Sequence, residues 1–238
     1  MPDIFLKASW ENIIMANYSV NPELLKPYLP KGVELDYYNN KTYISLVGFM
    51  FNDTSLFNIP IPFIGNFEEI NLRFYVKRIE GDTVKRGVVF INETVPYKAV
   101  AWLAKKLYKE HYIAIPTKNS IEIIKNIKKV KYSWKMKQKW NKLEVNTYTE
   151  KEAMASESME EYIFEHYYGY TKVANHLAQE YRVNHPKWLI NKVINYSIDC
   201  DFQGMYGDDF SCLNNCEPES VIMAEGSPVS INWKRDSF

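Results

Sequence analysis

The amino-acid sequence predicts a mainly β protein with flanking helices, an α+β fold whose antiparallel strands form a closed or nearly closed sheet. Aromatic residues make up 15% of the 238 residues, a share that favours strands and a cavity-rich core over a helical bundle. Runs of β-branched and aromatic residues alternate with short turn signals along most of the chain. Because no repeat, linker or low-complexity stretch interrupts this pattern, we expect residues 1–238 to form a single domain.

Short strands joined by short turns are the main predicted elements. Gly81–Asp82 and Asn141–Lys142 are predicted to be hairpin tips, and a third hairpin is expected around Ala174–His176. The predicted strands are Thr42–Phe51, Ile70–Arg78, Arg86–Val95, Val130–Trp140, Leu143–Tyr148, Gln179–Asn184 and Ile198–Gln203.

Three segments carry helix signals. Asn21–Pro22 is typical of a helix cap followed by the first helical residue, and Pro30 marks the end of this helix. Residues 100–112 place apolar side chains at helical spacing. Ser158 and Glu161 have the spacing of a capping box at the start of a third helix.

The composition excludes several classes of protein. Lys and Arg together number 29, as do Asp and Glu, so the net charge gives no general attraction to nucleic acid. No run approaches the roughly 18 apolar residues that span a bilayer, and the first twenty residues lack the pattern of a signal peptide. Cys200, Cys212 and Cys216 suit a reducing cytoplasm. Because no histidine or further cysteine is near Cys212 and Cys216 to complete a metal site, we expect a cytoplasmic protein without a metal or other cofactor.

A lysine-rich segment extends from residue 98 to residue 142. In the predicted strand 130–140, lysines share one face and aromatic residues share the other, so the aromatic rings could not stack bases that the lysines hold. We therefore favour a solvated strand face over a nucleic-acid site. The alternative is a protein without catalytic activity that binds nucleic acid or a partner through this strand. The acidic segment 199–225 could also face the lysine-rich segment in a homo-oligomer.

The segment around Arg73 is the most informative for function. Ile70, Leu72, Phe74 and Val76 share one face of a strand, and a polar set occupies the other. Inside a closed sheet this polar face would meet a cavity, where Glu69 and Arg73 would pair and hold a carboxylate or carbonyl ligand. On the strand alone, a half-buried strand with a solvated polar face is the simpler interpretation. The polar set is Glu69, Asn71, Arg73 and Tyr75.

Other groups could transfer protons. The segment Glu165–Thr171 concentrates an acid, an imidazole and three phenols, and His166 and His111 could serve as general bases because imidazole titrates near neutral pH. Lys105–Lys106 is a pair of adjacent cations, an arrangement that can make an amine nucleophilic, as the known example of acetoacetate decarboxylase illustrates. In a helix, however, neighbouring side chains point in different directions, which favours two solvated lysines.

Taken together and in order, ten segments of the chain resemble the YqjF-like bacterial proteins, a family of unknown function grouped with the acetoacetate decarboxylase-like fold. The resemblance covers nearly the whole chain. The segments are Trp10–Asn12, Asn21–Leu25, Pro27–Gly32, Tyr43–Phe49, Asn66–Glu69, Asn71–Arg73, Arg86–Phe90, Glu165–Tyr170, His185–Trp188 and Ala224–Val229.

The resemblance implies a cone-like antiparallel β-barrel with flanking helices and an internal cavity. It also implies a departure from the decarboxylases, which use a Schiff-base lysine beside a second lysine. Their lysine pair falls near His111–Tyr112 of this chain, whereas Lys105–Lys106 comes several residues too early. Their first-strand arginine falls near Ala8 or Ser9, and an acidic residue of their second strand falls near Ser45.

We therefore expect a cavity that binds a small carbonyl or carboxylate compound. We expect acid/base chemistry without a Schiff-base lysine, and whether the protein is an enzyme is left open. The alternative is a Schiff-base lyase or decarboxylase of a β-keto acid that uses a lysine of segment 105–109. The expected ligand-binding residues are Glu69, Asn71, Arg73, Tyr168 and Tyr170, and the expected catalytic residues are His111, Tyr112 and His166.

Overall fold

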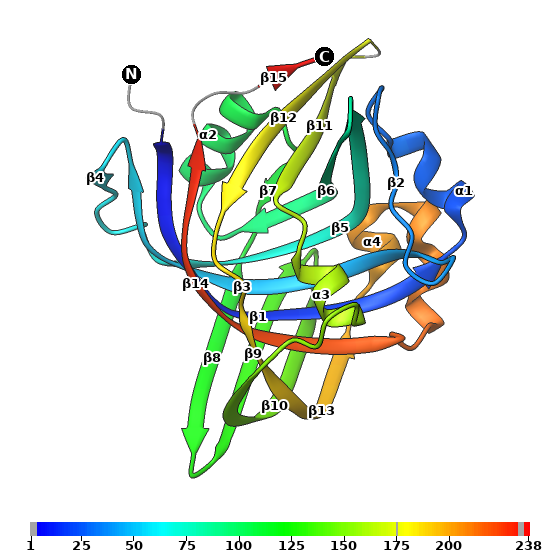
Figure 1. Ribbon diagram of the computed structural model, residues 1–238. Helices are drawn as coiled ribbons and strands as arrows, with labels where there is room; N and C mark the ends of the chain where they lie inside the picture. The colour runs from blue at the N-terminus through cyan, green and yellow to red at the C-terminus, as the bar shows by residue number, and fades with distance from the viewer. Residues whose placement is uncertain (1–3, 175, 233–235) are drawn as a thin grey trace.

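The computed structural model describes residues 4–174, 176–232 and 236–238, and its strands belong to one 15-stranded sheet (Figure 1). The sheet is mainly antiparallel, which confirms the prediction of a mainly β protein with flanking helices. The strands are β1 (Ile4–Val20), β2 (Glu34–Leu35), β3 (Thr42–Leu56), β4 (Ile59–Pro60), β5 (Phe67–Glu80), β6 (Thr83–Val95), β7 (Tyr112–Ala114), β8 (Thr117–Ile124), β9 (Ile127–Met136), β10 (Lys139–Ala153), β11 (Tyr168–Ala174), β12 (Leu177–Asn184), β13 (Leu189–Asp199), β14 (Ser220–Asn232) and β15 (Asp236–Ser237).

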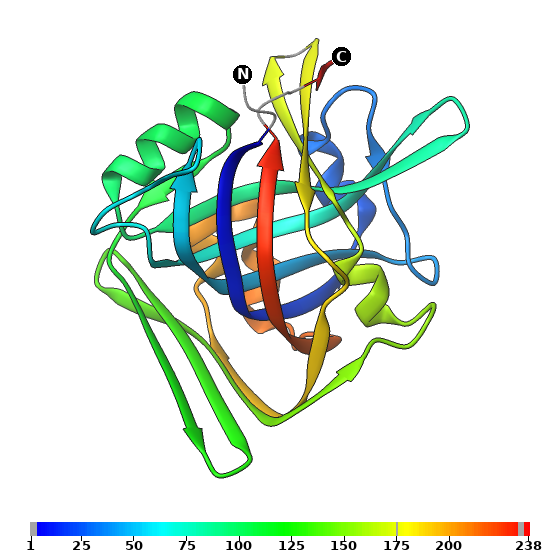
Figure 2. The same cartoon turned by 60° about the vertical axis from the view of Figure 1, so that its left-hand side comes forward.

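The strand order closes part of the sheet into a ring. The main path runs β15-β12-β11-β6-β5-β3-β1-β14-β13-β10-β9-β8, and an additional pairing joins β12 to β14. In that pairing Val183 lies opposite Ile231 and Asn184 lies opposite Ser230. The strands from β12 through β6, β5, β3 and β1 to β14 therefore surround an interior, which Figure 2 shows behind β1 and β14.

Both faces of the central strands are buried. Ile70, Leu72 and Phe74 of β5 pack into one hydrophobic cluster, and Phe67 and Tyr75 pack into a second cluster on the opposite face. Successive side chains of a strand point to opposite faces, so a strand with two buried faces serves two cores at once. One face of β5 contributes to a packed hydrocarbon core, and the other contributes to the interior of the ring.

The first core lies between the central strands and the sheet extension β9–β10 with its adjoining helices. Tyr132 and Trp134 of β9 are fully buried in it, and Phe202, at the start of the helix that follows β13, is almost fully buried. Gly48 of β3 lies at the closest approach, where an added Cβ would be 2.7 Å from Cδ2 of Tyr132. Only glycine allows the ring to lie against the β3 backbone at this point.

The helical segments are short and cover the ends of the sheet (Figure 1). The predicted caps are confirmed: Oδ1 of Asn21 accepts a hydrogen bond from the Glu23 amide (3.0 Å), and Oγ of Ser158 accepts one from the Glu161 amide (3.1 Å). None of the helices in the described part of the chain is long and apolar enough to cross a membrane. The segments are α1 (Pro22–Leu25), η1 (Lys26–Tyr28), α2 (Lys98–Tyr108), α3 (Met159–Phe164), α4 (Phe202–Tyr206) and η2 (Asp208–Asn215).

Two predicted hairpins are confirmed and one is wrong. Glu80 pairs with Thr83 around Gly81–Asp82, and β11 pairs with β12 around the 174–176 segment, of which residue 175 lies outside the described residues. The Asn141–Lys142 prediction fails because the turn lies at 137–138, where Lys139 pairs with Met136. Asn141 is instead fully buried inside β10.

Two strand predictions are corrected by this arrangement. The predicted strand 130–140 is divided between β9 and β10 by that turn, in which Lys137 adopts a positive φ of 52°. The predicted strand Ile198–Gln203 ends at Asp199, because the Asp201 side chain caps α4 by accepting a hydrogen bond from the Gly204 amide (2.9 Å). Both errors have the same cause: the pattern of apolar residues is the same for one long strand and for two shorter elements, so it does not locate the boundary between them.

Candidate functional site

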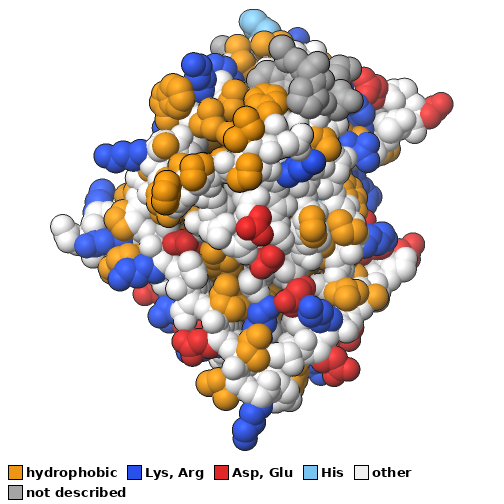
Figure 3. Space-filling view, turned by 90° about the vertical axis from the view of Figure 1, so that its left-hand side faces the viewer, with side chains coloured by type: hydrophobic (Ala, Val, Ile, Leu, Met, Phe, Trp, Pro, Cys, Tyr) orange, Lys and Arg blue, Asp and Glu red, His pale blue; other side chains and the backbone are white. Residues whose placement is uncertain are grey.

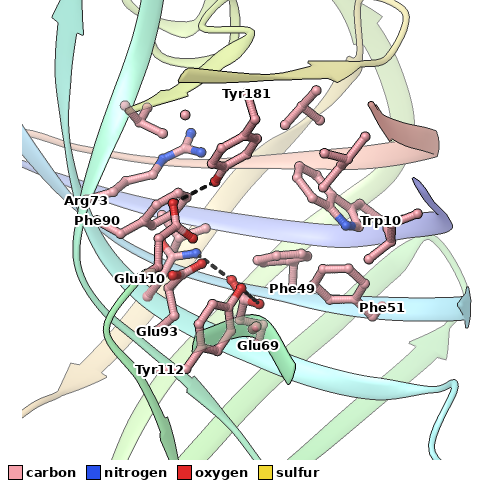
Figure 4. A pocket seen from close by; sticks show the side chains of 18 of the residues that line it. Trp10, Phe49, Phe51, Glu69, Arg73, Phe90, Glu93, Glu110, Tyr112 and Tyr181 are labelled. Atoms are coloured by element: carbon pink, nitrogen blue, oxygen red, sulfur yellow. Dashed lines mark hydrogen bonds between the residues drawn. The ribbon is translucent and has the colours of Figure 1, made fainter. Parts of the chain in front are cut away.

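The interior of the ring contains a pocket of about 120 Å³ (Figure 4). Side chains from β1, β3, β5 and β6 form its base and walls, and α2, β11 and β12 contribute further lining. The pocket has a polar side with acidic residues and Arg73, and an aromatic side with Trp10, Phe49 and Phe51. A pocket with a few converging polar groups in a mostly apolar lining is the usual form of a small-molecule site.

The polar side begins at Glu69 of β5. Its Oε1 accepts a hydrogen bond from Asn71 Nδ2 (3.0 Å), and its Oε2 accepts one from the Tyr112 hydroxyl (3.3 Å). Asn71 is two residues along the same strand, so period two places both side chains on the pocket face. Tyr112 comes from β7, which pairs in parallel with β6. The sheet register therefore brings three expected site residues together.

Two further glutamates complete the acidic group. Glu93 lies on β6 opposite Asn71, and Glu110 follows the end of α2. The carboxylate of Glu110 accepts hydrogen bonds from the hydroxyls of Tyr181 (2.8 Å) and Thr171 (3.1 Å). Glu93 is 2% exposed and Glu110 is 7% exposed, so this carboxyl cluster is withdrawn from bulk water.

Burial changes the acidity of these groups. Desolvation raises the pKa of Glu69 to about 7, and the nearby Glu110 carboxylate adds to the effect, while the hydrogen bond from Asn71 opposes it. Desolvation also raises the pKa of Glu93 well above its ordinary range, with further repulsion from Glu110 and Glu69. At neutral pH the cluster therefore retains dissociable protons inside the pocket. A carboxyl group with a pKa near the working pH is suited to general acid or base chemistry.

Arg73 does not form the ion pair with Glu69 that the sequence predicts. Among the described residues no carboxylate lies within 4.0 Å of its guanidinium nitrogens. Its Nη2 lies 3.5 Å from Met15 Sδ, a weak acceptor, and its Nε is buried without a hydrogen-bond partner. The physical reason is spatial: the two residues are four apart on β5, which separates their Cα atoms by about 13 Å, and Asn71 lies between them on the same face.

His166 lies in the pocket lining and is held by a buried carboxylate. Its Nε2 is 3.3 Å from Asp36 Oδ2, and that oxygen also lies 3.2 Å from Nε of Arg86. Burial lowers the pKa of the imidazole despite the hydrogen bond to Asp36, so the ring is neutral at neutral pH. A neutral imidazole oriented by a carboxylate can accept a proton.

The structure separates the remaining expected site residues. Tyr168 lines the pocket, whereas Tyr170 is fully buried in the first core, where its hydroxyl donates to the Lys85 carbonyl (3.1 Å). His111 is exposed and does not contribute to the lining. Lys105, Lys106 and Lys109 are also exposed, and no lysine is among the described residues that line the pocket.

Sequence reasoning missed Glu93, Glu110 and the aromatic side of the pocket. Glu93 had a usable signal in the sequence, because it is a charged residue near the end of a mostly apolar predicted strand. The structure shows that it is buried. Glu110 lies in the lysine-rich segment and gave no signal, since its contacts with Tyr181 and Thr171 span the chain.

The aromatic side consists of rings in contact with one another. The Trp10 ring lies 5.1 Å from that of Phe49 and 5.6 Å from that of Phe51, both edge to face. Phe51 in turn stacks on Phe67 at 4.8 Å. These residues come from β1, β3 and β5, which are neighbours in the ring. On the face shown in Figure 3, hydrophobic side chains gather in the upper half.

The structure also locates the other sequence features. No group of three or more potential metal ligands occurs among the described histidine, cysteine, aspartate and glutamate residues. Lys129 and Lys131 lie 3.1 and 3.9 Å from the Glu144 carboxylate oxygens, so two lysines of the basic strand have partners within the sheet. Tyr132 and Trp134 on the opposite face are buried in the first core, as the alternation predicts.

Solved structures with this fold belong to acetoacetate decarboxylase-like proteins. The enduracididine biosynthesis enzyme MppR in complex with pyruvate aligns with a TM-score of 0.67 and 11% identity, covering 100% of this chain and 91% of that chain. An acetoacetate decarboxylase-like enzyme from Sphingomonas wittichii RW1 aligns with a TM-score of 0.65 and 9% identity, covering 100% and 94%. The acetoacetate decarboxylase of Legionella pneumophila aligns with a TM-score of 0.62 and 10% identity, covering 97% and 85%. At these identities the likeness shows the fold alone.

The sequence relatives narrow this class. The DUF2071 family model, described as an uncharacterized conserved protein, matches residues 7–228. The chain belongs to this family. It is also similar to the uncharacterized protein YqjF of Bacillus subtilis (strain 168), with 26% identity over 192 residues that cover 78% of this chain and 74% of the relative.

Proposed function

We propose that the protein binds a small organic compound with a carbonyl or carboxylate group in this pocket, with Arg73 as the anchor. The proposal rests on one observation: the Arg73 side chain lines the pocket, and its guanidinium has no carboxylate partner among the described residues. Its contacts are the Met15 sulfur and the Tyr75 ring, whose centroid lies 5.7 Å from Cζ. An arginine held in this way without a carboxylate partner is suited to a ligand carboxylate or carbonyl, since its planar fork donates two parallel hydrogen bonds.

The neighbouring acids limit what the anchor accepts. A carboxylate ligand would meet repulsion from ionised Glu69 and Glu93, and their raised pKa values reduce that repulsion because the carboxyls can be protonated. A neutral carbonyl meets no such penalty. The site therefore favours a carbonyl compound, or a carboxylate that binds together with a proton.

The same groups support acid/base chemistry without an amine nucleophile. With a ketone held at Arg73, the Glu69 carboxylate would remove a proton from the adjacent carbon, and the electron pair would move into an enolate whose oxygen faces the guanidinium. Glu69 would hold this proton, which exchanges with water before a proton returns to the same carbon in the reverse step. Tyr112, at the position that the resemblance assigns to the decarboxylases' lysine pair, offers a hydroxyl and not an amine.

Pyruvate is a suitable first probe, because the MppR structure named above contains it. We expect pyruvate to bind in isothermal titration calorimetry and Arg73→Gln to weaken binding about tenfold or more. Lys192→Gln, at an exposed cation outside the pocket lining, should leave binding unchanged. Equal affinity in Arg73→Gln and the wild-type protein would remove Arg73 as the anchor.

Two measurements separate the chemical alternatives. In D₂O, proton abstraction would exchange the methyl protons of pyruvate, and Glu69→Gln would stop this exchange without abolishing binding. Treatment with borohydride and pyruvate, followed by mass spectrometry, should give no lysine adduct. A stable adduct on Lys105, Lys106 or Lys109 would instead establish the Schiff-base alternative. Binding without exchange would indicate a binding protein.

A further inference from the structure

The pocket has two chemically distinct sides, and the proposed anchor occupies only one. In Figure 4 Arg73, Glu93 and Glu110 lie on one side, and Trp10, Phe49 and Phe51 lie on the other. We infer that the ligand is an arylalkyl carbonyl or carboxylate compound with a single aromatic ring, a conclusion that rests on the proposed function. The polar group would lie at Arg73, and the ring would lie against the aromatic side.

The geometry of the aromatic side supports a ring over an alkyl chain. The Trp10 ring meets its phenylalanine neighbours edge to face, so it presents a rigid aromatic surface to the pocket. Aromatic pairs are more favourable than their buried area alone explains, and they prefer such tilted or offset contacts. The remaining polar group on this side, the Trp10 indole N–H, is buried without a hydrogen-bond partner.

The size of the pocket limits the ring system. Its volume of about 120 Å³ is close to that of an engineered protein cavity of about 150 Å³ that accepts benzene. We therefore expect the pocket to accept one six-membered ring with a short polar chain, and not a fused bicyclic ring. The close contacts between Phe51, Phe67 and Trp10 leave little freedom for expansion, because packed interiors do not yield easily.

The test compares ligands that differ only in the apolar group. Pyruvate, phenylpyruvate and 3-(2-naphthyl)pyruvate are titrated calorimetrically into the wild-type protein and Phe49→Leu. We expect phenylpyruvate to bind about 10- to 100-fold more tightly than pyruvate, and the naphthyl compound to lose that advantage. Phe49→Leu should reduce the affinity for phenylpyruvate more than the affinity for pyruvate. Nuclear Overhauser contacts between the ligand ring and the Trp10 indole supply a readout that needs no variant.

The two proposals fail differently. Equal affinities for pyruvate and phenylpyruvate, both lost in Arg73→Gln, would overturn the aryl inference and keep the proposed function. Binding of phenylpyruvate that survives Arg73→Gln would overturn the anchor and leave only an apolar pocket. No binding of any of the three compounds would overturn both.

A second inference comes from a different part of the molecule, the β8–β9 hairpin that projects beyond the rest of the fold (Figures 1 and 2). β8 lies at the end of the strand order, and within the described residues it pairs only with β9. Ile121, Ile123 and Ile124 are 37%, 62% and 68% exposed. An exposed edge strand with apolar side chains is a ready template for pairing with another strand.

The charge pattern of β8 is complementary to itself. If two copies pair in antiparallel orientation with Ser120 opposite Ser120, Lys118 of each copy lies opposite Glu122 of the other, and the Ile121 side chains become diagonal neighbours. Moving the centre of symmetry to residue 119 or 121 loses both charge pairs. Neither charged residue forms an ion pair within the described chain; Lys118 lies 4.7 Å from the Trp140 ring centroid, and Glu122 accepts from Ser120 Oγ (3.0 Å).

We propose that two copies of this chain associate through β8 in this register, joining their sheets across a two-fold axis. Such an interface is isologous, so one substitution acts twice. Lys118→Glu would place two pairs of glutamates opposite each other, and Glu122→Lys would place two pairs of lysines opposite each other. Like charges opposite one another on paired strands are destabilising.

Analytical ultracentrifugation of five samples tests this register. We expect a dimer for the wild-type protein, a dissociation constant about tenfold or more higher for each single variant, and recovery of the dimer in the double variant. An equimolar mixture of the two single variants should form a heterodimer, because every 118–122 pair is then attractive. A wild-type monomer would overturn the proposal. A dimer that neither single variant weakens would overturn it as well.

Discussion

The substitution Glu69→Gln tests the buried carboxyl cluster most directly. The amide keeps the size of the side chain and cannot ionise. In the folded protein the pKa of Glu69 is raised from 4.5 to about 7, so below pH 4.5 the group is protonated in both the folded and unfolded states. As the pH rises from 4.5 to 7, the unfolded chain loses this proton first. The unfolding free energy of the wild-type protein therefore falls over this range.

The magnitude follows from the separation of the two pKa values. Each pH unit within that range changes the unfolding free energy by about 1.4 kcal/mol, which gives about 3 kcal/mol in total as an upper bound. The glutamine in Glu69→Gln does not titrate, so the variant does not lose this stability. Its unfolding free energy relative to the wild-type protein should therefore rise between pH 4.5 and pH 7, and the difference should be constant above pH 7. Urea unfolding at pH 5, 6, 7 and 8, followed by tryptophan fluorescence, measures the difference. The exposed control Glu152→Gln should show none. A Glu69→Gln difference that does not change with pH would refute a raised pKa at this site.

Three other predictions concern the same architecture. Binding of a carboxylate ligand such as pyruvate near Glu69 should be accompanied by uptake of a proton, so its affinity should fall as the pH rises above about 7. Calorimetry in buffers of different ionisation enthalpy measures the uptake. Zero uptake at pH 7 would contradict the prediction. Gly48→Ala should destabilise the protein by about 1–3 kcal/mol, because the new Cβ would contact the buried Tyr132 ring; a urea midpoint equal to that of the wild-type protein would contradict this. Asn141→Ala should lower the unfolding free energy by about 1–3 kcal/mol, because the Trp134 carbonyl and the Asp201 amide lose hydrogen bonds of 3.3 and 2.8 Å. A similar urea titration measures the change. A decrease below about 0.5 kcal/mol would show that water replaces the Asn141 amide.

The corrected elements show which sequence signals are reliable. Asn21 and Ser158 cap helices as predicted, because a cap is a contact between residues two or three apart. Asn141 carries the same type of side chain that favours turns, yet it bonds to the Trp134 carbonyl and the Asp201 amide inside the protein. A turn propensity and a buried bridging role look alike in sequence, and only the contacts across the fold distinguish them.

The sequence by itself determined the mainly antiparallel architecture and the alternation that places Glu69, Asn71 and Arg73 on one face of a strand, because period two is a local property of the backbone. Only the tertiary structure decided that this face meets a pocket and that Glu93, Glu110 and Tyr112 join it. Those groups come from separate elements whose register depends on closure of the ring between β12 and β14. It also decided the partners of Glu69, which are Asn71 of the same strand and Tyr112 of β7 in place of Arg73. Long-range pairing and desolvation set the chemistry of the site, and neither can be derived from the spacing of residues along one strand.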